Sequence, residues 1–210
     1  MDRKILIFGA TGNTGLEICK ELESLDIKHS AFVRKGSESK IQTKHTGIIF
    51  GDVLDMKDVE NAIDRQRFTD IVIALGSRNL KGENIRSNGT KNIVDFLTLN
   101  SIDAKLHVVS AHGVGNSWSQ LKWHEKLISK LFIAKTMKDH ELQEEIVKSN
   151  TGGFHIIRPV ALKNEPSKGS IHCISEGGMP NGSISRIDVA KFLVKSIMDN
   201  KKGFSSICNK

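Results

Sequence analysis

Seven residues near the amino terminus have the composition and spacing of a phosphate-binding turn. Gly9, Gly12 and Gly15 recur every third residue between a short apolar run at 5–8 and a helical pattern. In a strand–turn–helix unit such glycines make the tight turn, let the backbone approach a pyrophosphate, and let the helix pack on the strand. Backbone N–H groups at the helix start then face the anion. The candidate contacts of this turn are Gly9, Thr11, Gly12, Asn13, Thr14 and Gly15.

A glycine-rich turn without a ligand is the alternative, but the order of strand, turn and helix favours a dinucleotide. A Walker phosphate loop is excluded because the Gly-Lys-Ser/Thr sequence is missing. The spacing Gly-x-x-Gly-x-x-Gly is typical of short-chain dehydrogenases and their extended relatives.

Arg34 and Lys35 follow the second apolar run, where an NAD-selective site places an acid for the ribose 2′-hydroxyl. A cationic pair suits a 2′-phosphate, and Ser37 adds a hydroxyl donor. We therefore expect NADP(H) as the cofactor. Two surface charges with no ligand are the alternative.

Further candidate contacts follow the third and fourth runs. Asp52 is placed to accept from the adenine amino group beside Val53, or to cap the helical segment that follows. Leu75 and Gly76 form a small-residue turn that lets a cofactor pass closely, and Arg78 either reaches a phosphate or faces solvent.

The residues available for catalysis point away from alcohol–ketone chemistry, because the chain contains no tyrosine to protonate a carbonyl oxygen. Ser110 ends the fifth run and is a candidate to hold nicotinamide or substrate; a plain strand-end turn is the alternative. His112 is a candidate proton donor or stacking partner, or simply a solvated loop histidine. Trp118 and Trp123 either flank a planar substrate or pack a helix. No His, Cys, Asp or Glu spacing fits zinc, so we expect no metal.

The elements that must position these residues alternate along the chain. Short runs rich in β-branched residues recur at 5–8, 31–33, 48–50, 71–73, 107–109 and 154–157, with amphipathic stretches between them. This alternation predicts an α/β fold: a Rossmann-type, doubly wound parallel sheet in three αβα layers. We expect a single domain over 1–210, with a dinucleotide-binding half (1–110) and a substrate-side half (111–210).

The helical predictions are specific enough to test. Ile18, Leu22 and Leu25 share one predicted helix face, and 120–149 predicts one long or broken helix. An irregular substrate-side stretch is expected from 160 to 182. Ser185 resembles a capping residue for a last helix, and 204–208 predicts a short edge strand.

The composition limits which ligands, disulfides and cellular location the protein is expected to have. The net charge of +7 fits a solvated surface that serves a phosphorylated ligand; nucleic-acid or membrane-surface binding ranks last. Cys19, Cys173 and Cys208 are too scattered for a disulfide framework. No signal-peptide core or membrane span is recognisable, so we expect a cytoplasmic protein.

Several motifs together resemble the biliverdin reductase B (flavin reductase) family, an atypical, NmrA-like branch of the short-chain dehydrogenases/reductases. They are Gly-Ala-Thr-Gly-Asn-Thr-Gly at 9–15, Phe-Val-Arg at 32–34, Gly-Asp-Val-Leu at 51–54, Leu-Gly-Ser-Arg-Asn at 75–79, Gly89 to Val94, Ser110, Lys-Asp-His at 138–140, Arg-Pro at 158–159 and 185–190.

The resemblance implies a monomeric NADPH-dependent reductase acting on a small planar conjugated substrate, a flavin or a linear tetrapyrrole. It implies cofactor contacts at Pro159 and at Val160, where the family's reductases carry a histidine. Some NmrA-like proteins instead bind the dinucleotide without turnover and signal redox state to a partner; the missing tyrosine and Val160 fit this alternative equally well.

Overall fold

The computed structural model describes residues 3–41, 44–76, 84–115, 117, 134–174 and 182–209. A sheet of eight strands runs through the molecule in the order β3-β2-β1-β4-β5-β6-β10-β8. Neighbouring strands are parallel except for β10 and β8, which are antiparallel. The strands are β1 (Ile5–Phe8), β2 (His29–Val33), β3 (Thr46–Phe50), β4 (Asp70–Ile73), β5 (Lys105–Val109), β6 (Phe154–Pro159), β8 (Ile171–Ile174) and β10 (Gly203–Asn209).

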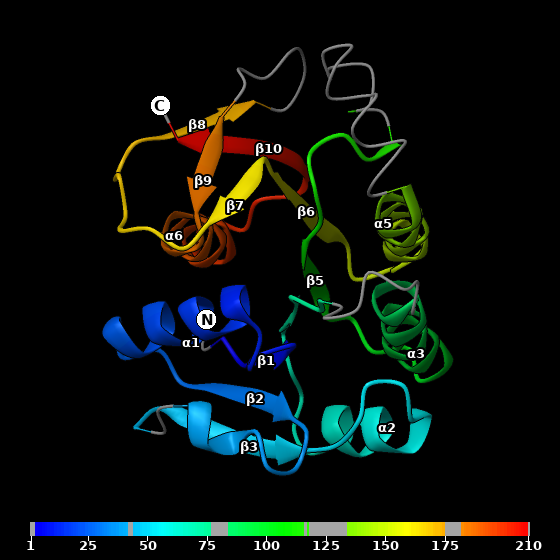
Figure 1. Ribbon diagram of the computed structural model, residues 1–210. Coiled ribbons are helices and arrows are strands. Elements are labelled where there is room, and N and C mark those ends of the chain that lie inside the picture. The colour runs from blue at the N-terminus through cyan, green and yellow to red at the C-terminus, as the bar shows by residue number, and fades with distance from the viewer. Residues whose placement is uncertain are drawn as a thin grey trace.

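Helices cover both faces of this sheet (Figure 1). One face carries α1 (Asn13–Ser24) and α6 (Arg186–Met198), and the other carries α2 (Met56–Asp64), α3 (Ile85–Leu99) and α5 (Ala134–Lys148). A short 3₁₀ turn, η1, spans Glu38–Lys40, and β7 (Ala161–Lys163) pairs with β9 (Ser183–Ser185). The predicted doubly wound, three-layer architecture is confirmed. The strand order reverses between β1 and β4, which is where open parallel sheets bind ligands.

The two faces contribute separate hydrophobic cores. Along β1, Ile5 and Ile7 pack with α1 and α6, whereas Leu6 and Phe8 pack with the opposite helices. Successive strand side chains point to opposite faces, so a strand covered on both sides must be apolar throughout. All four of these side chains are completely buried.

Three sequence predictions need correction. The stretch at 160–182, predicted to be irregular, contains β7 and β8. The last strand is not at the edge: β10 lies between β6 and β8, because β8 returns antiparallel and pairs with its outer side. Leu25 is 53% exposed rather than buried, because α1 ends at Ser24 and the residue lies beyond the helical face.

Other predictions hold. Ser185 caps α6, since its hydroxyl accepts the backbone N–H of Asp188 at 3.0 Å. The three cysteines are free. Of the predicted helix in 120–149, α5 forms its second half, and the part before Ala134 lies outside the described residues. No described helix is long and apolar enough to span a membrane.

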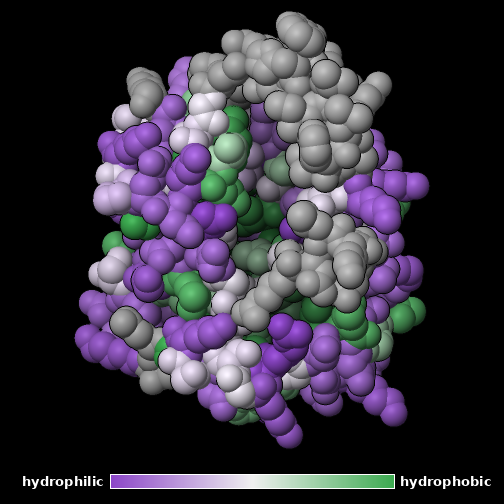
Figure 2. All heavy atoms as spheres, in the orientation of Figure 1, coloured by the Kyte–Doolittle hydropathy of each residue, from purple (hydrophilic) through white to green (hydrophobic). Residues whose placement is uncertain are grey.

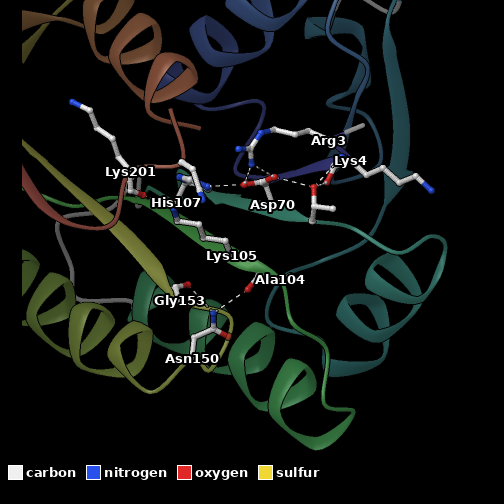
Figure 3. A network of polar contacts seen from close by, with 11 residues as sticks. Arg3, Lys4, Asp70, Ala104, Lys105, His107, Asn150, Gly153 and Lys201 are labelled. Atoms are coloured by element: carbon white, nitrogen blue, oxygen red, sulfur yellow. Dashed lines mark hydrogen bonds and ion pairs between the residues drawn. The ribbon is translucent and has the colours of Figure 1, made fainter. Parts of the chain in front are cut away.

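Buried polar groups join the amino ends of β4 and β5 (Figure 3). The Asp70 carboxylate accepts two hydrogen bonds from Arg3, at 2.9 and 3.0 Å, and one from the Thr69 hydroxyl at 2.8 Å. It also lies 2.9 Å from Nε2 of His107. Burial lowers the pKa of this fully enclosed imidazole. The network braces the sheet edge opposite the carboxyl ends of the strands, and is therefore part of the framework rather than the site.

Candidate cofactor and active site

The glycine turn between β1 and α1 is shaped by close backbone packing. Gly9 has φ +82°, and a Cβ there would lie 2.4 Å from the carbonyl oxygen of Ala74 at the end of β4. A Cβ on Gly15 would lie 2.1 Å from the carbonyl oxygen of Gly9. Neither position accepts a side chain, so these two glycines serve the turn and the helix–strand contact.

Gly12 has a different role, because it is exposed at the N-cap of α1; a Cβ there would lie 3.3 Å from the Gly9 carbonyl oxygen, which is a tight contact but not a clash. Its N–H bonds to the Gly9 carbonyl at 3.0 Å, and no side chain caps the helix terminus. Asn13 beside it is exposed, and Thr11 and Thr14 are half-buried. This accessible positive end of a helix fits a pyrophosphate.

Arg34 directly follows β2 and is exposed. The turn after it is closed by a hydrogen bond from the Ser37 N–H to the Arg34 carbonyl at 3.0 Å, with Gly36 at φ +81°. None of the ion pairs found among the described residues involves Arg34. Its guanidinium and the half-buried Ser37 are therefore available to a phosphate.

Asp52 stabilises the turn after β3, where its carboxylate accepts the N–H of Leu54 at 3.0 Å. The cap of α2 is instead Asp55, which accepts the N–H of Lys57 at 2.9 Å. The alternative capping role thus belongs to a different aspartate, and Asp52 stays exposed.

Val53 and Leu75 are held by α3. A Cβ on Gly89 would lie 2.9 Å from side-chain atoms of both, and Asn92 donates to the Val53 carbonyl at 2.9 Å. Gly76 has no neighbour within 4 Å of a built Cβ among the described residues, which leaves room for a ligand to pass. The predicted contact at residue 78 lies outside the described residues.

The ends of β5 and β6 bring the remaining predicted residues together. The N–H of Ser110 donates to a β6 carbonyl at 2.8 Å, and the N–H of His112 donates to the Pro159 carbonyl at 2.9 Å. Val160 continues the row by donating to β10 at 3.1 Å. Its half-buried side chain packs against the core beneath α1 and α6, so it offers no polar group where the resembling family has histidine.

A buried ion pair beneath Ser110 was missed by sequence reasoning. The Ser110 hydroxyl donates to Oε1 of Glu144 on α5 at 2.6 Å. Arg158 on β6 donates to the same oxygen from Nε at 2.9 Å and to Oε2 from Nη2 at 2.6 Å. The exposed fractions are 3% for Ser110, 1% for Glu144 and 3% for Arg158, so all three are buried. The available signal was a charged residue, Arg158, inside the largely apolar strand Phe-His-Ile-Ile-Arg-Pro.

Several candidate residues take no part in this arrangement. Positions 118 and 123 lie outside the described residues. His140 is buried on α5, and burial together with nearby Arg86 lowers its pKa to about 3, so it is no proton donor near neutral pH. Among the described residues no cluster of three or more His, Cys, Asp or Glu is arranged to hold a metal ion.

The surface between the two helical layers is hollowed, and hydrophobic residues line the bottom of the hollow (Figure 2). Concave, mostly apolar surfaces with a few polar groups are typical of sites for small molecules and cofactors.

Similar proteins share this fold over nearly their whole length. The anaerobilin reductase ChuY of Escherichia coli O157:H7 superposes with a TM-score of 0.82 at 18% identity, covering 98% of this chain and 97% of that chain. A short-chain dehydrogenase/reductase of Veillonella parvula in complex with NADP gives 0.81 at 16% identity, with 99% and 94% covered. A candidate NADH-flavin reductase of Streptococcus pneumoniae gives 0.75 at 16%, with 99% and 100% covered.

Two sequence matches complete the comparison. An uncharacterized chloroplastic protein of Arabidopsis thaliana is 26% identical over 212 residues, covering 98% of this chain and 75% of the relative. The family described as NAD(P)H-binding matches residues 9–200, which include the glycine turn and both halves of the site. The chain belongs to this NAD(P)H-binding family.

Proposed function

We propose that the protein is an NADPH-dependent reductase that transfers hydride to a planar conjugated acceptor, a flavin or a linear tetrapyrrole. The observation that carries this proposal is a dinucleotide-binding turn on the same sheet as Ser110 and His112, in a chain without tyrosine. A conjugated ring spreads the charge that arrives with hydride and can take its proton from water. For such an acceptor the protein needs mainly to bind and orient the two reactants.

Different residues of the chain would bind different parts of the cofactor and of the acceptor. The start of α1 would hold the pyrophosphate, Arg34 and Ser37 the 2′-phosphate, and Asp52 the adenine. Ser110, His112, Pro159 and Val160 would border the nicotinamide and the acceptor. The cofactor, when bound, supplies the hydride. The similarity in fold to an anaerobilin reductase and to a candidate flavin reductase supports this acceptor class.

Replacing Arg34 with alanine is expected to erode a preference for NADPH over NADH. A charge-assisted contact to the 2′-phosphate contributes about 1.5 to 3 kcal/mol, or roughly 10- to 150-fold in affinity. Calorimetric titration with both cofactors measures the preference. Arg65→Ala is the matched control, because it removes one exposed positive charge from the end of α2 and should leave discrimination unchanged. If Arg34→Ala and wild type prefer NADPH over NADH equally, residues other than Arg34 determine the cofactor preference.

Ser110→Ala is expected to lower turnover several-fold without abolishing it, because the hydroxyl orients a ligand and forms no covalent bond. The fold should persist, since Glu144 keeps both hydrogen bonds from Arg158. His112→Ala should cost little with flavin and more with a substrate whose protonation accompanies hydride arrival. The measurement is kcat/KM with FMN and with biliverdin. Complete loss of flavin reduction in either variant, with NADPH affinity intact, would require an obligatory side-chain acid.

The same site also suits an NADP(H)-binding redox sensor, because apolar Val160 and the absent tyrosine remove two groups expected of a dedicated enzyme. Steady-state NADPH oxidation with FMN, FAD, riboflavin or biliverdin separates the two functions. A reductase exceeds the rate of the free-solution reaction. A sensor binds NADPH but does not exceed that rate.

A further inference from the structure

We propose that Ser110 recognises its ligand only as a hydrogen-bond acceptor, so that the group bound there is an N–H donor. Two sources fit this chemistry: the carboxamide of the nicotinamide, or a ring N–H of the substrate. The inference deepens the proposed function and rests on it. It concerns which atoms the site selects, and it assigns Glu144 as the residue that sets the direction of the hydrogen bond.

The hydroxyl has one proton, and that proton is already used. Ser110 donates it to Glu144 at 2.6 Å. Glu144 also receives two hydrogen bonds from Arg158, one on each carboxylate oxygen, in a bidentate ion pair. An ionised carboxylate accepts and cannot donate. The three hydrogen bonds that join Ser110 and Arg158 to Glu144 are therefore all directed toward the carboxylate.

If the hydroxyl turned toward a ligand carbonyl, it would exchange a strong hydrogen bond to Glu144 for a weaker one to a neutral oxygen. Hydrogen bonds to an ionised acceptor are about twice as strong as neutral ones. The exchange would also remove a hydrogen-bond donor from a carboxylate that is only 1% exposed. The position of the serine backbone is itself fixed by the 2.8 Å hydrogen bond to β6. For a ligand that reaches Ser110, the hydroxyl therefore has its remaining lone pairs, and no proton, to offer.

This arrangement selects among substrates. A serine that stabilises a developing oxyanion has to donate a hydrogen bond to it, so carbonyl reduction gains no such stabilisation from Ser110. A carboxamide N–H, a pyrrole N–H or the N3–H of a flavin does gain a hydrogen bond. The direction of one proton thus supports the same acceptor class as the missing tyrosine, but from an independent observation.

The cofactor arm of the test compares NADPH with reduced 3-acetylpyridine adenine dinucleotide phosphate, which keeps the carbonyl and replaces NH₂ by CH₃. Dissociation constants are measured by calorimetry for wild type and Ser110→Ala. If the carboxamide is the donor, wild type should bind the analogue about 2- to 10-fold more weakly than NADPH, beyond any ratio seen in Ser110→Ala. This measurement requires no turnover.

The substrate arm compares lumiflavin with 3-methyllumiflavin in the NADPH-dependent reaction of the same two proteins. If the substrate is the donor, methylation should lower kcat/KM by a similar factor in wild type and not in Ser110→Ala. A response in either arm supports the inference and identifies the source. The inference is overturned if neither arm responds, or if Ser110→Ala discriminates as strongly as wild type.

Glu144→Gln tests the positioning role, because a neutral amide can donate to the serine oxygen and release its proton toward the ligand. In the arm that responds, the preference for the ligand with the N–H over its analogue should fall toward the value measured in Ser110→Ala. An unchanged preference would overturn the assignment of Glu144. If this variant does not fold, the comparisons with Ser110→Ala still decide the main claim. If the protein binds no NADPH, both the proposed function and this inference are wrong. If it binds NADPH and reduces flavin but responds in neither arm, only this inference is wrong.

Discussion

Glu144→Ala is expected to lower the free energy of unfolding by about 3 to 5 kcal/mol, because it removes the carboxylate partner of a buried cation. Arg158 would lose both hydrogen bonds to its carboxylate partner while it remains only 3% exposed. Its guanidinium also lies over the Phe204 ring, 4.3 Å from the centroid, but a ring contact does not neutralise a buried charge. Urea denaturation at neutral pH measures the loss.

The neighbouring Glu145→Ala provides the control, because Glu145 is exposed on the same helix. That substitution should change stability by no more than about 0.5 kcal/mol. A loss below about 1 kcal/mol in Glu144→Ala would mean that the ion pair contributes no more than a surface contact.

Acid should destabilise the protein steeply below neutral pH, because buried histidines take up protons only on unfolding. Burial and nearby His107 lower the pKa of His155 to about 3, and burial lowers that of His140 to about 3. The unfolded value is about 6.5, so stability is fully present above pH 6.5 and is lost progressively toward pH 3. Two such groups reduce the free energy of unfolding by about 4 kcal/mol between pH 7.5 and pH 5.

His155→Gln isolates one of these groups. Its ring is completely buried and lies 3.0 Å from the Ser205 hydroxyl, which a glutamine amide can replace as a partner. Urea unfolding should show the loss of stability between pH 7.5 and pH 5 reduced by about 2 kcal/mol. His172→Gln, a change to a half-buried residue on the edge strand β8, should leave that dependence unchanged. An undiminished dependence in His155→Gln would assign the acid sensitivity to other groups.

The local sequence pattern alone was sufficient to predict the three-layer fold, the glycine turn and the cap of the last helix. Apolar runs covered on both faces, such as 5–8 and 71–73, can only be inner strands of a sheet between helices, so the three-layer fold follows from periodicity. The glycine turn was equally predictable, since Gly9 and Gly15 occupy positions where backbone packing permits no side chain. The capping role of Ser185 depends on a residue only three positions away.

Predictions failed where the deciding partner is distant in sequence. Whether the strand at 203–209 is an edge depends on β8 returning beside it, and no local pattern encodes that pairing. The role of Asp52 was left open for a different reason: Asp52 and Asp55 lie three residues apart, and each accepts the N–H two residues ahead of it.

For the site, the sequence by itself determined the residue types at the ends of the strands, and with them the cofactor class. Only the tertiary structure decided how Ser110 can act, because Glu144 is 34 residues away and its hydrogen bond with the serine exists only when α5 packs beside the ends of β5 and β6. A glutamate on a helix ordinarily faces water. Here the buried Arg158 draws it inward, since a cation enclosed in the core requires a carboxylate partner within hydrogen-bond reach.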